Sequence, residues 1–383
     1  LQRQSETPFD VDGRLAVDAR YEGEPISLST GIETANGNRS LQNFAARIVG
    51  AVANGSITLR GDGLLDGNLS LNVPSLERLA PLALTEASGR LTADIGLSVD
   101  GTTQSAQIKG TANQVEVAGI SLGFVDIALA IEDAFGVPAL DGTVAARAVK
   151  AAGFDVRDLN LDARRDGDAT DMTLRADLGS GNLDATGRLQ RQPSGFSASL
   201  SEFNLSRAGF TARLLAPTEV QVGETIEIGR TALQVGSGEV DVSGRIGDTL
   251  DLNVVLNALP LEVANLVRAD LGLEGTVSGN LDLTGTREDP TATVEVNANG
   301  VSAAVLSQRG IAPLTIVAAG NYADGTATIR RFETTVSGGS ISAFGTVGET
   351  LDVNVSLSDL PLALANAAAS DLGLSGTVSG TAT

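Results

Sequence analysis

Any catalytic chemistry in this sequence would have to come from carboxylates. The closest groups are Asp166, Asp168 and Asp171, and the pair Glu288 and Asp289. Paired carboxylates carry out acid–base and glycosidic chemistry when burial separates their pKa values. Both groups lie in charge-rich, turn-like stretches next to arginines, which indicates solvated loops. A glycan-active enzyme that uses carboxylates alone is therefore the weakest interpretation, and only 10 Phe, 2 Tyr and no Trp are present for sugar stacking.

Other catalytic and metal-binding machinery lacks its residues altogether. The chain contains no His and no Cys, so nucleophilic triads and zinc, haem or iron–sulfur sites cannot be assembled in their usual forms. No EF-hand loop or calcium β-roll repeat is present. We therefore expect no enzyme activity, no cofactor and no metal site.

Charge and composition narrow the class of protein further. Asp and Glu number 47 against 26 Lys and Arg, for a net charge of −21. This acidic excess repels phosphate, so we expect no nucleic-acid partner. The chain is nevertheless 42% hydrophobic, with 45 Gly among its 383 residues. A Gly-rich, aliphatic composition that is poor in aromatics is typical of many short strands joined by tight turns.

An internal repeat is the clearest feature of the sequence. Leu250–Gly279 recurs, without gaps and with many identities, at Leu351–Gly380, 101 residues later. A weaker copy lies at 69–96. We therefore predict one continuous, repeat-built segment over residues 1–383, with its clearest units at 250–350 and, truncated, at 351–383.

Each copy of the repeat has three parts. Strict alternation from Leu250 to Leu256 and from Leu351 to Leu357 predicts a strand with one apolar and one polar face. A Pro-initiated amphipathic helix follows, and then a Gly-flanked strand. We expect helices over Ser75–Leu84, Leu261–Leu271 and Leu362–Leu372, and a further one over Gln42–Ala53. The polar strand positions Asp251, Asn253, Asp352 and Asn354 should face solvent.

A shorter strand unit recurs between glycines, for example at Gly238–Gly244 and Gly339–Gly345. Asp-Gly and Asn-Gly pairs supply hairpin turns, and Asp324-Gly325 is predicted to join two strands. The fold class that follows is mainly β: a long antiparallel sheet built from repeats of about 100 residues, with short amphipathic helices.

The continuous apolar face of this sheet has two interpretations. In the first, two such sheets close on each other as a sandwich about 10 Å thick, and the face is ordinary core. In the second, the sheet curls without closing and leaves an apolar groove. Alternation alone does not separate them.

No stretch is long enough to span a bilayer. The longest apolar stretches, Phe44–Ala53 and Leu360–Ala369, are about half of the ~20 residues that a spanning helix needs. The chain begins at Leu1 without Met, shows no signal peptide and stops within a repeated motif at Thr383. We therefore expect an internal piece of a longer protein.

The order of the repeat motifs resembles a known family. A Leu-Pro-Leu helix is followed by Leu-Gly-Leu-x-Gly-Thr-Val-Ser-Gly in Leu259–Gly279 and Leu360–Gly380, and Leu281–Gly285 and Pro290 lead into another strand. This order resembles the TamB proteins, the translocation and assembly module subunits of the AsmA-like superfamily. The resemblance covers most of the chain and is strongest from about Ser201 onward.

The resemblance implies an elongated, curved, U-shaped sheet with an apolar groove. It implies a periplasmic location in a Gram-negative bacterium, with the full-length protein anchored in the inner membrane by a part outside this segment. It also implies phospholipid transport between the inner and outer membranes, with acyl chains as ligands, and outer-membrane protein assembly with an Omp85-type partner, TamA, bound through other regions.

On this interpretation the apolar strand positions line a lipid groove. These are Leu250, Leu252, Val254, Leu256, Leu351, Val353, Val355, Leu357, Val240, Val242, Ile341 and Ala343. The alternative is a structural or adhesive secreted β-solenoid, similar to an autotransporter passenger, with a closed core and no ligand. Its rungs of roughly 20–30 residues fit poorly with a 101-residue unit that contains a helix.

Overall fold

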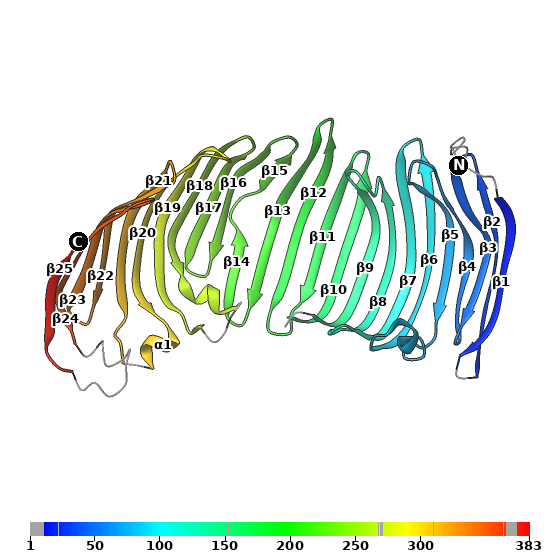
Figure 1. Ribbon diagram of the computed structural model, residues 1–383, viewed down its shortest axis with the longest axis horizontal. Helices are drawn as coiled ribbons and strands as arrows, with labels where there is room; N and C mark the ends of the chain where they lie inside the picture. Colours follow the sequence, from blue (N-terminus) through cyan, green and yellow to red (C-terminus); the bar gives the residue numbers. More distant parts are fainter. Residues whose placement is uncertain are drawn as a thin grey trace, which may run out of the picture. The chain divides into compact units, whose positions relative to one another are not determined.

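The fold is described by a computed structural model covering residues 11–21, 23–151, 154–266, 268, 271–308, 310–362, 364 and 374–383. The chain divides into two compact units, Leu1–Arg191 and Gln192–Thr383. Both consist almost wholly of antiparallel strands (Figure 1). The prediction of a mainly β, antiparallel fold is therefore confirmed.

In the first unit, each strand pairs with the next one along the chain from β1 to β12. This is the simplest antiparallel connectivity, in which a turn or loop joins each strand to its neighbour, the longest being residues 74–86 between β5 and β6. The strands are β1 (Val11–Tyr21), β2 (Glu24–Ala35), β3 (Asn38–Ile48), β4 (Ala51–Leu59), β5 (Leu65–Val73), β6 (Ala87–Asp100), β7 (Thr103–Val117), β8 (Ile120–Glu132), β9 (Ala139–Ala151), β10 (Phe154–Asp166), β11 (Ala169–Asp177) and β12 (Asn182–Gln192).

The second unit follows the same plan with one interruption. Strand β13 pairs with both β14 and β15, which are separated by Leu215–Pro217 and both pair with β16. From β16 to β25 each strand again pairs with the next. The strands are β13 (Gly195–Arg207), β14 (Phe210–Leu214), β15 (Thr218–Val222), β16 (Ile226–Val235), β17 (Gly238–Ile246), β18 (Thr249–Pro260), β19 (Glu274–Thr286), β20 (Pro290–Ser302), β21 (Leu314–Ala323), β22 (Thr326–Val336), β23 (Gly339–Val347), β24 (Leu351–Pro361) and β25 (Thr377–Ala382).

The hairpin predicted at Asp324-Gly325 is confirmed. Ala323 pairs with Thr326, and both turn residues have positive φ, 49° at Asp324 and 71° at Gly325. These values suit a two-residue type I′ turn, whose twist matches that of the strands it joins. The backbone conformation of the two turn residues and the pairing of the strands they join therefore both indicate the same hairpin.

The sequence repeat is also a structural repeat. Strands β17 and β23 begin and end at positions that differ by 101 residues, at 238 and 339 and at 246 and 347. Both contain a glycine of strongly positive φ, 141° at Gly244 and 144° at Gly345. At each, an added Cβ would lie within 2.1 Å of a carbonyl oxygen in the facing strand. Glycine is required there because the two backbones approach too closely for any side chain.

The predicted helices are shorter than expected. Within Ser75–Leu84 only the 3-10 helix η1 (Ala80–Ala83) forms, and the helix from Leu261 is the 3-10 helix η2 (Leu261–Leu266). The helix over 362–372 lies almost entirely outside the described residues. A one-turn helix that was not predicted, α1 (Ala304–Ser307), follows β20.

The helix predicted over Gln42–Ala53 is wrong. These residues form the end of β3, a turn at Val49-Gly50 and the start of β4. Val49 and Gly50 have φ of 49° and 90°, which end any helix. Apolar runs of this length fit a helix or a strand equally well, and here pairing of β3 on both of its edges decides for strands.

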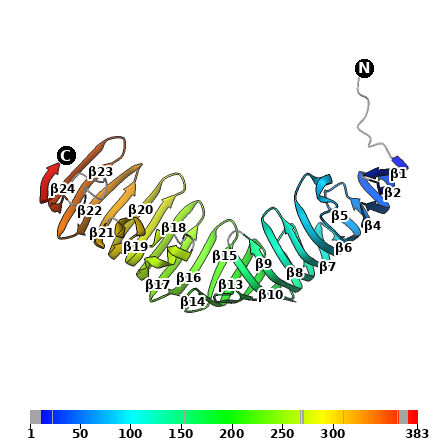
Figure 2. The ribbon, with the colours of Figure 1, turned by 90° about the horizontal axis from the view of Figure 1, so that it is seen from below.

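The described strands form single layers. Contacts between elements run mainly between paired strands, with η2 lying against β19 and a small contact between β9 and β11, and Figure 2 shows the strands of each unit edge-on without a second sheet above them. Among the described residues, the buried apolar side chains are all Ala or Val, and the largest side chain that is fully buried is Thr170. The core is therefore confined to small side chains between adjacent strands.

Candidate functional site: an apolar sheet face

The apolar positions of the second unit lie opposite one another from strand to strand. Val242 of β17 faces Val254 of β18, which in turn faces Leu281 of β19. Residues that are directly opposite in a ladder point to the same side of the sheet. Alternating residues of these strands therefore build a continuous apolar face, called the apolar face below.

The same face continues through the second repeat. Leu281 faces Val294 in β20, and the ladder leads through β21 and β22 to Ala343 in β23 and Val355 in β24. All the residues predicted to line a groove, on β17, β18, β23 and β24, thus lie on this one face. They are half-buried, except that Leu351 is 75% exposed. Their contact with lipid stays a prediction.

The reverse face of the same strands is polar. Asp251, Asn253, Asp352 and Asn354 occupy the alternate positions of β18 and β24, as expected. Asn253 Nδ2 donates to a carboxylate oxygen of Asp282 at 2.7 Å. Hydrogen bonds between neighbouring strands thus satisfy polar groups on this side, whereas the apolar face carries only scattered polar side chains, such as the hydrogen-bonded pair Thr218 and Thr231.

An ion pair on the reverse face shifts both of its partners. Arg230 Nε lies 2.8 Å from Asp241 Oδ1, and the Asp241 side chain is only 16% exposed. The hydrogen bond from Arg230 lowers the pKa of Asp241 below its usual value, and the same bond raises the pKa of Arg230. This ion pair thereby fixes one positive and one negative side chain on the reverse face, between the neighbouring strands β16 and β17.

The first unit carries an apolar face of its own, which sequence reasoning did not identify. Leu69 of β5 faces Ile95 of β6, and Ile95 faces Ile108 of β7, which faces Leu129 of β8. The alternation is present in the sequence, but small residues such as Gly110 break it into short runs. A search for period-two alternation that tolerates Ala and Gly would have found it.

A hollow of about 440 Å³ lies in the apolar face between β20 and β23. Its floor includes Ala318, Gly320 and Ala343, and its walls include Tyr322 and Phe332. The aliphatic positions singled out from sequence do not include the two aromatics. A bulge at Arg330 breaks the alternation of β22 and hides Phe332 from a period-two search.

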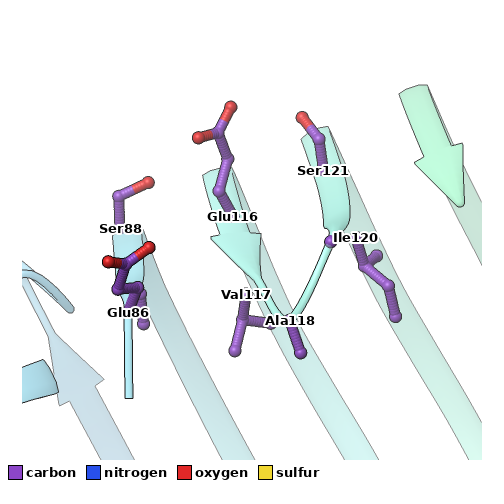
Figure 3. Close-up of a pocket in the computed structure, with 9 residues that line it drawn as sticks. Glu86, Ser88, Glu116, Val117, Ala118, Ile120 and Ser121 are labelled. Carbon is purple, nitrogen blue, oxygen red and sulfur yellow. The ribbon is translucent and has the colours of Figure 1, made fainter.

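Figure 3 shows a second hollow, of about 380 Å³, at the turn between β7 and β8. Glu86, Glu116 and Ser121 point to one side of the sheet, whereas Val117 and Ile120 point to the other. The separation of polar and apolar side chains onto opposite faces of the sheet thus extends to the ends of these strands. Two exposed carboxylates do not make a metal site, and no group of three or more carboxylates that could hold a metal ion occurs among the described residues.

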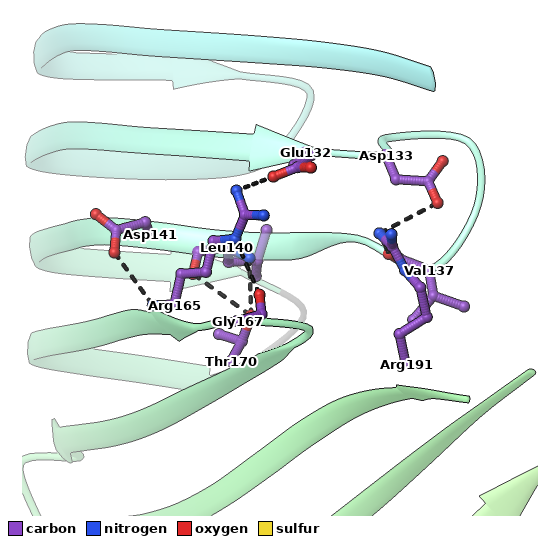
Figure 4. Close-up of polar contacts among 9 residues, drawn as sticks. All are labelled: Glu132, Asp133, Val137, Leu140, Asp141, Arg165, Gly167, Thr170 and Arg191. Atoms are coloured by element: carbon purple, nitrogen blue, oxygen red, sulfur yellow. Dashed lines mark hydrogen bonds and ion pairs between the residues drawn. The ribbon is translucent and has the colours of Figure 1, made fainter. Parts of the chain in front are cut away.

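A polar network braces the ends of β8 to β12 in the first unit (Figure 4). Thr170 Oγ1 accepts from the Leu140 N–H at 2.9 Å and so links β11 to β9 directly, where β10 bends away. Arg165 forms an ion pair with Glu132. Arg191 Nη2 donates to the Val137 carbonyl at 2.8 Å. These are contacts that hold chain segments together.

The carboxylates considered for catalysis lie in such a structural role. Arg188 binds Asp166 through Nη2 and Asp171 through Nη1, each at 2.8 Å, with all three side chains at least 37% exposed. These hydrogen bonds raise the pKa of Arg188. These charges are solvated, as expected, and do not form a buried acid–base pair, but Asp166 and Asp171 lie in strands β10 and β11, and Asp168 lies in the turn between them.

The chain has far more surface than a closed core would leave. Its accessible surface is 22,818 Å², whereas two compact proteins that share a mass of 38.9 kDa equally expose about 17,000 Å² together. In the described residues, no second sheet covers the apolar face as the sandwich interpretation requires. Every strand pairing given above is antiparallel, which also differs from the parallel rungs of a β-helix.

Comparisons with known proteins do not identify the chain. No family model, curated protein or solved structure matches it. Within the part of the chain that the structure describes, none of the helices has both the length and the apolar character needed to cross a membrane.

Proposed function

We propose that this chain is a segment of a periplasm-spanning, TamB-like protein whose apolar face carries phospholipid acyl chains between the inner and outer membranes. The observation that carries the proposal is the half-exposed apolar face that runs without interruption from β16 to β24. No described layer covers it, and it is lined mainly by short aliphatic side chains. The curling of the sheet around its cargo is part of the proposal.

The chemistry of the face suits a mobile hydrocarbon cargo. Each buried methylene contributes about 0.8 kcal/mol, so withdrawing a 16-carbon acyl chain from a membrane costs about 12 kcal/mol. A continuous aliphatic strip offsets most of this cost at every position. Because few polar groups interrupt it, no single position holds the chain, which favours movement along the strip.

The remaining parts of the proposal come from the resemblance to the TamB proteins. The protein would be non-enzymatic, and the full-length chain would be anchored in the inner membrane. It would also assist outer-membrane protein assembly with an Omp85-type partner, TamA, through other regions. The acidic charge of the segment supports a cargo held by its hydrocarbon part rather than by its phosphate.

Two neighbouring residues of β18 allow a direct test. Val254 lies on the apolar face and Val255 on the reverse face, where it opposes Asp241. A photoreactive benzoylphenylalanine placed at 254 should cross-link a phospholipid that co-purifies or is added in vesicles, and the same group at 255 should not. Equal cross-linking from the two positions would overturn the proposal.

A charge-insertion variant gives a second measurement. Asp at Leu252, Val254 and Val353 should lower bound phospholipid at least tenfold, because a carboxylate cannot be buried against hydrocarbon. The matched control places three Asp residues on the reverse face at Ser243, Asn354 and Ser356. Circular dichroism checks that both variants keep their strands. If the variant with Asp on the apolar face keeps its strands and still binds as much phospholipid as the wild type, the proposal is contradicted.

A further inference from the structure

The hollow between Tyr322 and Phe332 is a departure from the repeat that surrounds it. In β16 and β17 of the preceding unit, Thr231 faces Val242. In β22 and β23, 101 residues later, Phe332 faces Ala343. The same scaffold thus carries an aromatic wall and a small floor residue only in the later copy.

The neighbouring strand shows the same exchange. Val220 faces Ile228 in the preceding unit, whereas Gly320 faces Ile329 in the later one. The partner of Thr231 across the sheet is Thr218, whose hydroxyl lies 2.6 Å from that of Thr231 and fills the space. In the later copy Ala318 faces Phe332 and leaves that space empty. Smaller residues therefore occupy several adjacent positions of the later copy, and they make the apolar face deeper there than in the preceding unit.

The walls of the hollow are aromatic and its lining is almost wholly apolar. Phe332 lies on one side and Tyr322, 39% exposed, on the other. Aromatic rings prefer flat, rigid partners on which they can stack. Among the lining residues on the apolar face, the Tyr322 hydroxyl is the one polar side-chain group. Asn321, Thr328 and Arg331 also line the hollow, but they occupy positions of the reverse face.

The size of the hollow indicates what fills it. A cavity of about 150 Å³ holds one benzene ring, so about 440 Å³ corresponds to roughly three fused rings. A linear chain would leave part of this width empty, and it already finds a fitting surface on the aliphatic strips elsewhere. Asp324 and Glu349, in the two turns at the Tyr322 edge, disfavour an anionic end group there.

We propose that this hollow binds a rigid, fused-ring hydrocarbon that bears a single uncharged polar group, placed at the Tyr322 end. The inference rests on the proposed function, because it names a second cargo class for the same apolar face. It assigns to Tyr322 and Phe332 a specificity role that the aliphatic strips do not have.

The two-tyrosine composition provides a clean binding assay. The chain has no Trp and only Tyr21 and Tyr322, so Tyr21→Phe leaves Tyr322 as the sole emitter. The probe is dehydroergosterol, a fluorescent sterol, and the linear comparison is cis-parinaric acid. Energy transfer from Tyr322 to the bound sterol is expected, with saturation at one sterol per chain.

The variants use residues that the scaffold already tolerates. Phe332→Thr and Ala343→Val restore the residues of the preceding repeat at positions 231 and 242. Each should weaken sterol binding about tenfold by removing a stacking wall or filling the floor, while cis-parinaric acid binding changes less than twofold. Val255→Ala, on the reverse face of β18, is the control and should leave the binding of both probes unchanged.

The outcomes separate this inference from the proposed function. Binding of cis-parinaric acid without sterol binding, or sterol binding that both hollow variants retain, overturns the fused-ring site and leaves the conduit standing. An equal loss of sterol binding in Val255→Ala also overturns it. Failure of both probes to bind the wild-type chain contradicts the conduit itself.

Discussion

The backbone N–H of Ala258 donates a hydrogen bond to the hydroxyl of Ser278 across β18 and β19, at 2.8 Å. Ala258 has φ of 45° at a bulge, where the ladder leaves its N–H without a backbone partner. The same bond recurs 101 residues later, from Asp359 to Ser379 at 2.9 Å. In both copies of the repeat, a serine hydroxyl thus accepts the hydrogen bond from the backbone N–H at the bulge.

Ser278→Ala should therefore destabilise the second unit by about 1 kcal/mol, the usual cost of leaving such a donor without its partner. Amide hydrogen exchange at Ala258 should become faster, as should exchange at its neighbours in β18. Ser243→Ala, on the same polar side of β17, serves as the control and should have little effect. Unaltered exchange at Ala258 would show that the hydroxyl is dispensable.

A second prediction concerns Gly244. A Cβ at this position would lie 1.9 Å from the carbonyl oxygen of Asp251, at a φ of 141° that side chains rarely adopt. Gly244→Ala should cost about 2–4 kcal/mol, because β17 and β18 must move apart. Chemical denaturation followed by circular dichroism measures this loss.

Gly380 is a matched control for this substitution. It also lies in a strand, β25, but an added Cβ there meets nothing within 4 Å. Gly380→Ala should change stability by less than about 1 kcal/mol. Comparable losses in the two variants would mean that close approach of β17 and β18 does not set the cost at Gly244, because no atom opposes a Cβ at Gly380.

Local alternation was sufficient to predict which residues of β17, β18, β23 and β24 share a face. Period-two patterning specifies a face directly, and the 101-residue repeat showed that the pattern was not accidental. The Asp324-Gly325 turn was predictable for a similar reason, since its geometry depends on only two residues. In contrast, Gln42–Ala53 was misread because a short apolar run acquires its strand identity from partners far along the chain.

The hollow could not be predicted from any one stretch of sequence. It arises because Ala318 and Gly320 of β21 and Ala343 of β23 lie on either side of β22, on the same face of the sheet. No single one of these small residues indicates a hollow. The bulge at Arg330 shifts the alternation of β22, so the sequence pattern does not show on which face Phe332 lies. Cross-strand register, and not local pattern, determines where an apolar face is deep.

A third prediction concerns the pH dependence of the loop that contains η1. Glu77 accepts from the Gly89 N–H at 3.0 Å and from the Ser75 hydroxyl at 2.7 Å. These bonds, the one from Gly89 first, lower the pKa of Glu77 below its usual value. A carboxylate with a lowered folded-state pKa stabilises the fold above its unfolded pKa, and this contribution is lost as the pH falls through the folded pKa.

The protection of the Gly89 amide, which compares its exchange with the intrinsic rate at the same pH, should accordingly fall on acidification below the ordinary glutamate range. Glu77→Gln keeps an oxygen that can accept from Gly89 but does not titrate, so its Gly89 exchange should lack this additional pH dependence. The difference between the two proteins isolates the contribution of the charge. Parallel profiles in both would indicate that the carboxylate does not hold the loop.

The last prediction concerns the network in Figure 4 that secures the loop after β8. Arg191 Nη2 lies 2.8 Å from the Val137 carbonyl and 3.2 Å from Asp133 Oδ2, with the arginine side chain 32% exposed. Between these anchors Phe135 is 73% exposed and offers a site for chymotrypsin. Arg191→Ala should cost about 1–2 kcal/mol and speed cleavage after Phe135 several-fold, because two contacts are lost together. Arg164→Ala is the control, since Arg164 is 80% exposed and surface pairs contribute little; if both variants are cleaved at the wild-type rate, Arg191 does not secure the loop.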